Sequence, residues 1–260
     1  MKTETLHAVF FSATFSTKRV VQGIANLLEG NKIEHDITGV TTTKEIVLHK
    51  NDLLVIGVPV FSGRVPEMAL KGIQKIKGDC TPSLIVCVYG NRDYDDALIE
   101  LRELVCKQGC IPVAAAAIVA QHSIFNRVGA NRPDKEDWTA IENFCHKTQV
   151  ILNEWESAET SHQLQVPGHI PYRPIKNVPI HPTANRSCHG CGACAKLCLT
   201  QAIPLDSPQK TNKEKCISCG RCIIVCPQKA RNFRSLLFKL ASWKFNRQYA
   251  ERKEPEFFYL

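Results

Sequence analysis

Residues 188–198 read CHGCGACAKLC, and residues 216–226 read CISCGRCIIVC. The four cysteines of the first stretch recur in the second at a constant offset of 28 residues, and the pair Ala202 and Ala230 keeps that offset. The repeat predicts two copies of one small unit. Each copy has the spacing C-x2-C-x2-C-x3-C, in which thiolates two residues apart can bind three corners of an iron–sulfur cube.

Zinc is the alternative ligand for these cysteines. Structural zinc sites usually take separated C-x-x-C pairs rather than two runs of four cysteines, so the spacing favours two [4Fe–4S] clusters. An odd total of 13 cysteines also argues against a disulfide framework. The other five are expected to be buried apolar residues: Cys80, Cys87, Cys106, Cys110 and Cys145.

Over about residues 183–232 the sequence resembles the bacterial-type two-cluster ferredoxins. The second copy ends in Cys226-Pro227, as that family does, whereas Leu199 stands at the Pro position of the first copy. The resemblance implies a small α+β domain in which the last cysteine of each copy binds the cluster of the other copy. The implied ligands are Cys188, Cys191, Cys194 and Cys226 for one cluster and Cys216, Cys219, Cys222 and Cys198 for the other.

The net positive charge of the chain is confined to its last third. Residues 1–180 hold 19 Lys and Arg against 20 Asp and Glu, a net charge of −1, whereas residues 181–260 hold 14 against 5, a net charge of +9. A cube with four thiolates carries a charge of about −2 when oxidised, so two clusters offset much of the excess. We therefore expect no nucleic-acid partner.

Composition and length indicate a soluble protein with one full-sized core and a smaller unit. The chain has 260 residues, of which 44% are apolar and 22% charged, as in ordinary globular proteins. The N-terminus lacks the pattern of a signal peptide, and the apolar run 111–120 has about half the length of a membrane span. We expect a cytoplasmic protein without stable membrane insertion.

The first 160 residues alternate strand-like and helix-like patterns. Helical patterns near 20–28, 68–76, 98–105 and 138–155 separate apolar runs at 6–11, 33–37, 53–61, 83–89 and 111–120. Because most of these runs are apolar on both faces, they predict an α/β fold, a doubly wound five-stranded parallel sheet with helices on both sides.

Composition also divides the chain. Five prolines between 167 and 182 exclude regular structure, so residues 161–182 are expected to be a semi-rigid linker. The predicted organisation is an α/β domain over 1–160, the linker, a cluster domain over 183–232 and a basic, aromatic tail over 233–260. In the tail, Phe233, Leu236, Leu237 and Leu240 form a helical stripe. This stripe is expected to pack on the chain's own domains, with docking of an acidic partner or of a membrane surface as alternatives.

Three loops at the carboxyl ends of predicted strands suggest a cofactor site, because open α/β sheets bind ligands there. The loop Ser12–Thr17 offers four hydroxyls and the N–H groups of a helix start, which together can surround a phosphate. A helix cap rich in Ser and Thr is the alternative reading. Residues 59–66 and 89–96 form the other two loops, and Phe61 and Tyr94 could each present a ring to an aromatic cofactor.

With these loops, residues 4–155 resemble the flavodoxins, and the whole chain looks like a flavodoxin–ferredoxin fusion. The resemblance implies an FMN site with the phosphate at the first loop and the flavin ring between the other two. Phe15 departs from the family, which usually has Gly there. The implied contacts are Ser12, Thr14, Phe15, Ser16, Thr17, Pro59, Val60, Phe61, Gly63, Tyr89, Gly90, Asn91 and Tyr94. Asp93, Asp95 and Asp96 could either lower the flavin potential or cap a helix.

Two functions are compatible with these cofactors. The first is electron transfer through two [4Fe–4S] clusters and FMN between redox partner proteins, with the basic tail as a possible docking segment. The second is an FMN-dependent reductase of a small substrate, fed by the clusters. No acid–base pair stands out in the loops, which favours the first. No G-x-G-x-x-G follows a strand, so an NAD(P)H site is not expected.

Overall fold

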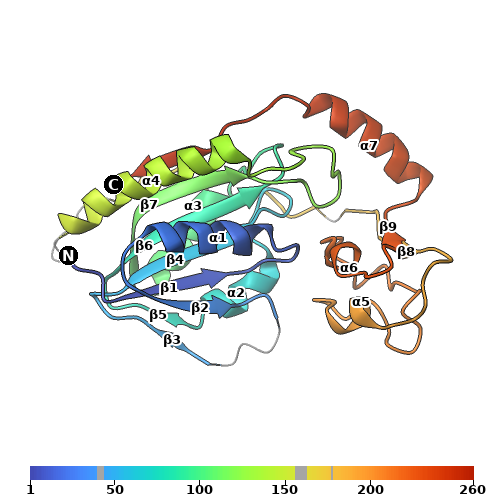
Figure 1. The fold of residues 1–260 in the computed structure, drawn as a ribbon, viewed down its shortest axis with the longest axis horizontal. Helices are drawn as coiled ribbons and strands as arrows, with labels where there is room; N and C mark the ends of the chain where they lie inside the picture. Colours follow the sequence, from blue (N-terminus) through green and yellow to red (C-terminus); the bar gives the residue numbers. More distant parts are fainter. Residues whose placement is uncertain (40–43, 156–162, 177) are drawn as a thin grey trace.

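The computed structural model describes residues 1–39, 44–155, 163–176 and 178–260. A large α/β domain and a small cysteine-rich domain lie side by side (Figure 1). The helix α7 (Leu236–Gln248) follows the small domain, and the chain then returns to the large one.

The large domain is built on a six-stranded sheet with the order β10-β7-β6-β4-β1-β2. Five of these strands are parallel: β1 (Thr5–Phe10), β2 (Asn31–Asp36), β4 (Leu53–Pro59), β6 (Thr81–Tyr89) and β7 (Cys110–Val119). The chain runs outward from β1 in both directions, which is the doubly wound order of flavodoxin-like folds. A separate small sheet pairs β3 (Ile46–Val47) with β5 (Ile76–Lys77).

Helices cover both faces of the sheet. The helices α1 (Ser16–Leu27) and α4 (Lys135–Asn153) bury their apolar stripes on one face. On the other lie α2 (Glu67–Ile73) and α3 (Ala97–Lys107). The helical pattern predicted through Ile76 ends at Ile73, because Ile76 pairs with Ile46 in the small sheet. Of the cysteines outside the repeats, Cys87, Cys110 and Cys145 are buried as expected, whereas Cys80 and Cys106 are exposed.

The sixth strand corrects the prediction of a five-stranded sheet. Residues Glu256–Tyr259 at the C-terminus form β10, which pairs antiparallel with the alanine-rich edge of β7. Phe257 stacks on Phe144 of α4, with ring centroids 4.9 Å apart. The tail therefore covers a sheet edge that would otherwise present unpaired backbone groups.

The predicted apolar stripe of α7 is only partly buried. Phe233 lies in a small core, but Leu236, Leu237 and Leu240 are 56–73% exposed. The helix instead packs with Phe238, Ala241 and Phe245, and the ring of Phe245 stacks on Phe125 of the large domain at 4.2 Å. Because α7 carries apolar side chains on two faces, periodicity alone could not show which face would be covered.

The small domain repeats one turn-and-helix unit. Gly192 and Gly220 have φ values of 74° and 82° and precede the short helices α5 (Ala193–Lys196) and α6 (Arg221–Ile224). Only glycine adopts this left-handed conformation readily. The strands β8 (Thr183–Ala184) and β9 (Arg231–Asn232) pair antiparallel.

The proline-rich segment between the domains is bound to the large domain. The carboxylate of Asp96 accepts hydrogen bonds from the backbone N–H groups of His169 (2.9 Å) and Arg173 (2.7 Å). Leu164 is buried in the core of the large domain. In the part of the chain that the structure describes, no helix is long and apolar enough to cross a membrane.

Candidate functional site

The small domain gathers four cysteines from both repeats around one small cavity. Its lining includes Cys188, Cys191 and Cys194 of the first copy together with Cys226 of the second. Burial alone would raise the pKa of Cys226, but the backbone N–H groups of Arg231, Ala230 and Gln228 lower it. Backbone donors of this kind stabilise a thiolate, which is the form that binds iron.

The other four cysteines lie together on the side of the large domain. Cys216 and Cys219 are close enough to Cys198 for its charge to raise the pKa of both thiols. Burial is the larger cause, and it raises the pKa of Cys219 to about 11 and that of Cys222 to about 12. Cys219 also packs against the main core of the large domain.

A buried arginine, Arg231, lies between the two groups of cysteines. Its charge bears on whether iron–sulfur clusters fit these sites. Arg231 is only 2% exposed, and its Nε has no partner. Its other nitrogens donate to the carbonyls of Pro182 and Pro208 and to the hydroxyl of Thr211, all neutral groups. Burying an unpaired charge is costly, and two anionic clusters would supply the missing negative charge. The cysteines and Arg231 together fit the clusters.

In the large domain, the Ser12–Thr17 loop joins β1 to α1. The Oγ of Ser12 accepts a hydrogen bond from the backbone N–H of Lys18 at 3.0 Å. Phe15 holds the helix N-cap position with φ 67° and caps no N–H group with its side chain. Thr14, Ser16 and Thr17 line a cavity at the helix start. The N–H groups at the helix start and these hydroxyls can bind an anion such as a phosphate.

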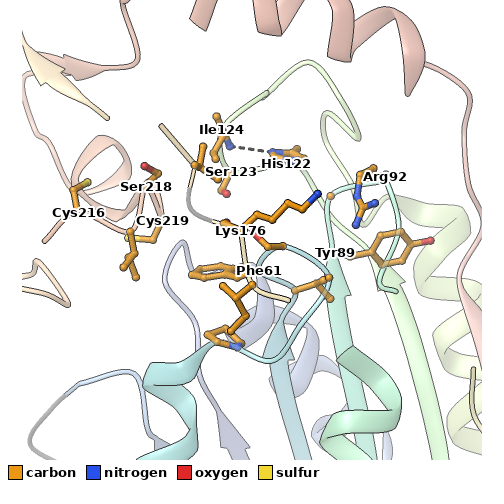
Figure 2. A pocket seen from close by; sticks show the side chains of 18 of the residues that line it. Phe61, Tyr89, Arg92, His122, Ser123, Ile124, Lys176, Cys216, Ser218 and Cys219 are labelled. Atoms are coloured by element: carbon orange, nitrogen blue, oxygen red, sulfur yellow. Dashed lines mark hydrogen bonds between the residues drawn. The ribbon is translucent and has the colours of Figure 1, made fainter. Parts of the chain in front are cut away.

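The second and third loops continue this cavity. Pro59, Val60, Phe61, Tyr89 and Gly90 line it beside the threonines. It adjoins a larger cavity of about 510 Å³, lined by Phe61 and Tyr89 on one side and by Cys216 and Cys219 on the other (Figure 2). Gly63 also lines this cavity. The predicted flavin loops and one predicted cluster site thus face the same space.

Two predicted flavin contacts have other roles in the structure. Tyr94 is buried, and its hydroxyl donates to the carboxylate of Glu256 in β10 at 2.8 Å. The side-chain amide of Asn91 donates to the carbonyls of Tyr249 and Glu251 in the tail. Both side chains hold the C-terminal tail, which the sequence pattern did not predict to cross this loop.

The three aspartates of the same loop also differ in their surroundings. Asp93 lines the large cavity. Asp95 pairs with Arg92 and Arg173, and Asp96 accepts the two linker N–H groups described above. Burial would raise the pKa of Asp96, but those N–H groups keep it below its usual range. Asp95 and Asp96 therefore fix the linker, and only Asp93 faces the cavity.

Sequence reasoning left His122 unassigned, yet it lines both cavities. Its Nδ1 accepts the backbone N–H groups of Ile124 (3.1 Å) and Phe125 (3.2 Å), so the neutral ring carries its proton on Nε2. Burial and the charge of Arg92 lower the pKa of His122 to about 4. The ring packs on Gly90, where an added Cβ would lie 2.6 Å from it. In the sequence, only its position just after the apolar run of β7, at the sheet edge of the other loops, could have indicated a place in this site.

One arginine of the small domain contacts the loop Ser12–Thr17, which is predicted to bind the phosphate. The Nη1 of Arg221 donates to the carbonyls of Ser12 (3.0 Å) and Ala13 (3.2 Å). Its guanidinium lies 5.0 Å from the ring centroid of Phe15. Arg221 precedes the cluster-ligand candidate Cys222, so the contact links the two cofactor sites.

Comparison with known proteins bears on the small domain. Residues 187–230 match the model of the 4Fe-4S dicluster domain. Over these residues the small domain is therefore similar to 4Fe-4S dicluster domains. No match to the sequence was found among curated proteins.

Solved structures similar to this chain include a rubredoxin:oxygen oxidoreductase from Desulfovibrio gigas, at 12% identity and a TM-score of 0.43, covering 59% of this chain and 37% of that one. A flavodoxin from Streptococcus pneumoniae TIGR4 shares 12% identity with a TM-score of 0.41, covering 56% and 98%. A Fusobacterium nucleatum flavodoxin bound to flavin mononucleotide shares 17% identity with a TM-score of 0.33, covering 42% and 69%. The strand order described above is what defines the fold.

Proposed function

We propose that the protein transfers electrons between two [4Fe–4S] clusters and an FMN held in the same chain. The observation that carries the proposal is the shared cavity, with predicted flavin contacts on one wall and Cys216 and Cys219 on the other. Flavin accepts one or two electrons and each cluster one, so the chain could connect one-electron and two-electron partners.

The proposed order of the cofactors follows from exposure. Cys191 of the first cysteine group is exposed, whereas Cys219 of the second packs against the large domain. A redox partner protein would therefore exchange electrons with the cluster held by Cys188, Cys191, Cys194 and Cys226. The second cluster, held by Cys216, Cys219, Cys222 and Cys198, would pass them to the flavin.

The residues of the chain have distinct tasks in this proposal. Thr14, Ser16 and Thr17 would bind the FMN phosphate at the start of α1. Phe61 and Tyr89 would bound the ring site, and His122 would present a neutral Nε2–H to it. Arg221 fixes the loop by binding the carbonyls of Ser12 and Ala13. The bound FMN supplies the two-electron chemistry.

Cofactor analysis tests the assignment. After anaerobic purification we expect about eight iron atoms and eight acid-labile sulfides per chain, with one FMN. One or two zinc atoms without sulfide would contradict the clusters. Release of FAD on denaturation would contradict the single phosphate site.

A second candidate function is reduction of a small substrate at the flavin. The observation in its favour is the size of the large cavity, about 510 Å³, within the range of small-molecule sites. Tyr94, expected to cover the ring, points instead at Glu256. If FMN-loaded protein leaves no space in this cavity for a second molecule in a co-crystal structure, the reductase is excluded.

The tail supports a proposal about partners. The outer face of α7 exposes Leu236, Leu240 and Trp243, and the helix has Lys239, Lys244 and Arg247 but no acidic residue. We propose an acidic redox protein as the partner. Crosslinking from Lys239 and Lys244 to such a protein tests this, with α7 lysines exchanged for glutamate as the control.

A further inference from the structure

Arg231 breaks the internal repeat at a buried position. The 28-residue offset that relates the cysteines places Arg231 opposite Ile203 of the first copy. Ile203 is 5% exposed and packs with Cys194 and Ala195, so the repeat predicts an apolar residue at 231. The structure instead buries an arginine there at 2% exposure.

The charge of Arg231 has no carboxylate partner among the described residues. Two backbone carbonyls and the Thr211 hydroxyl accept its hydrogen bonds. An arginine stays charged at any working pH. A fully buried, uncompensated guanidinium would be strongly destabilising, so its environment must supply an anion.

The nearest candidate anions are cysteine sulfurs of both groups. Nη1 lies 3.8 Å from the Sγ of Cys194, in the first group. Cys222, in the second group, packs in the same small core as Cys194. One guanidinium thus contacts a proposed ligand of the first cluster at the place where a proposed ligand of the second packs against it.

We propose that Arg231 is a shared cation that raises the reduction potentials of both clusters. Each cluster gains one negative charge on reduction, and a fixed positive charge beside it stabilises the reduced form more than the oxidised form. The proposal rests on the cluster assignment above. Because the charge lies between the clusters, both potentials respond to it together.

The test removes the positive charge at position 231 and keeps a side chain that fills part of the same space. In Arg231→Met we expect both cluster midpoint potentials to shift to lower values in a potentiometric titration followed by electron paramagnetic resonance. Arg231→Lys retains the charge and is expected to shift them less. Arg186→Met, at an exposed position of the same domain, is the matched control and should leave both unchanged.

The outcomes separate this proposal from the assignment on which it rests. Wild-type protein without iron and sulfide would contradict the clusters themselves. A fully loaded Arg231→Met with wild-type potentials would overturn the role of Arg231. If Arg231→Met fails to take up iron while Arg231→Lys loads fully and keeps both potentials near those of the wild type, a positive charge at this position acts on both clusters, as proposed. If both fail alike, the guanidinium serves packing only and the proposal is wrong.

Discussion

The guanidinium of Arg221 lies over the ring of Phe15, with 5.0 Å between the guanidinium carbon and the ring centroid. Phe15 belongs to the loop before α1, and Arg221 is the first residue of α6, directly before Cys222. The same guanidinium binds two carbonyls of that loop. The proposed flavin site is therefore shaped in part by the domain that carries the proposed clusters.

Removing this contact should weaken flavin binding. Arg221→Met loses the cation–π contact and two hydrogen bonds, together worth about 1–2 kcal/mol. We expect the FMN dissociation constant to rise by roughly 5- to 30-fold, measured by quenching of flavin fluorescence. Iron content and the control Arg186→Met should match the wild type. Unchanged affinity in Arg221→Met would show that the contact does not shape the site.

The loop itself should bind the phosphate. A double variant, Thr14→Ala with Thr17→Ala, is expected to purify without flavin and with full iron content, because the hydroxyls line the cavity at the start of α1. Thr139→Ala, on the exposed side of α4, serves as the control. Full flavin occupancy in the double variant would refute the assignment of this loop.

The cluster ligands should be crossed between the repeats. Cys226 lines the cavity of Cys188, Cys191 and Cys194, so Cys226→Ala is expected to damage that cluster. Cys198→Ala is expected to damage the cluster of Cys216, Cys219 and Cys222. Electron paramagnetic resonance of the two reduced clusters distinguishes them. Loss of the cluster nearest in sequence in each variant would contradict the crossing.

Tyr94 should affect stability rather than the flavin. Tyr94→Phe removes the hydrogen bond to Glu256 and is expected to cost about 1 kcal/mol of unfolding free energy. The flavin absorption spectrum and potential should stay the same. A changed flavin potential with unchanged thermal stability would instead place Tyr94 at the ring.

The stability of the large domain should fall in acid because of His122. Its pKa is about 4 in the folded protein, and an unfolded histidine titrates near 6.5. The unfolded chain therefore binds the proton first as pH falls, and this contribution is present above about pH 6.5 and lost toward pH 4.

The matching experiment compares the wild type with His122→Gln. Between pH 7.5 and pH 5 the wild type should lose about 2 kcal/mol more than the variant, or on the order of 4–8 °C in thermal midpoint. Equal losses in both proteins would show that His122 does not carry this pH dependence.

The sequence predicted the parallel sheet and the two cysteine repeats because both depend on local spacing, whereas the crossed grouping of the cysteines was implied only by the resemblance to two-cluster ferredoxins. The apolar runs of β1, β4, β6 and β7 are short and bounded by turns, and the four cysteines of each repeat lie within one stretch of eleven residues. The tail was not predictable in the same way. The pairing of β10 with β7 joins residues about 140 positions apart, and no local pattern encodes it.

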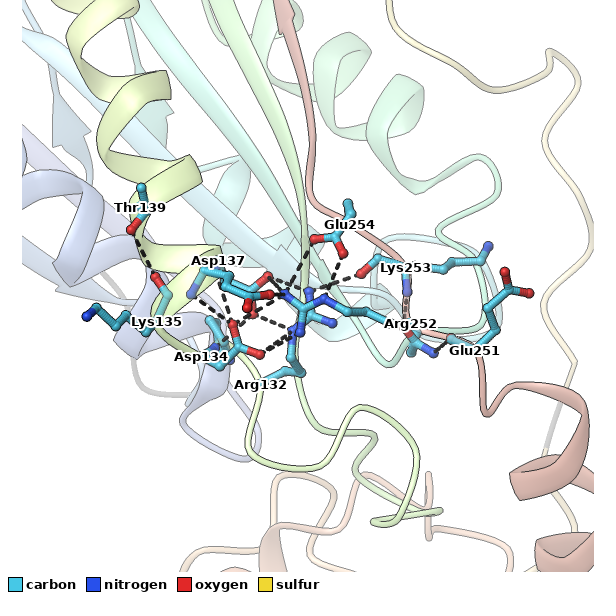
Figure 3. Close-up of polar contacts among 12 residues, drawn as sticks. Arg132, Asp134, Lys135, Asp137, Thr139, Glu251, Arg252, Lys253 and Glu254 are labelled. Atoms are coloured by element: carbon cyan, nitrogen blue, oxygen red, sulfur yellow. Dashed lines mark hydrogen bonds and ion pairs between the residues drawn. The ribbon is translucent and has the colours of Figure 1, made fainter.

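The same separation along the chain explains why the sequence did not show the partners of two side chains in the site. Asn91 and Tyr94 lie in the expected loop but bind the tail. Arg252 fixes that tail to the α4 N-terminus through Asp134 and Glu136, close to the buried pair Arg132 and Asp137 (Figure 3). Arg221 and Arg231 appeared in the sequence only as part of a basic excess, because their partners come from other segments.

The most direct test of the account is the kinetics of electron transfer from the clusters to the flavin. A laser flash with a one-electron reductant reduces a cluster in the fully loaded protein, and flavin absorbance then follows the transfer. Because the cysteines and the flavin loops line one cavity of a single chain, the rate should stay constant over a tenfold range of protein concentration. A rate that rises in proportion to concentration would show transfer between molecules and would contradict the account.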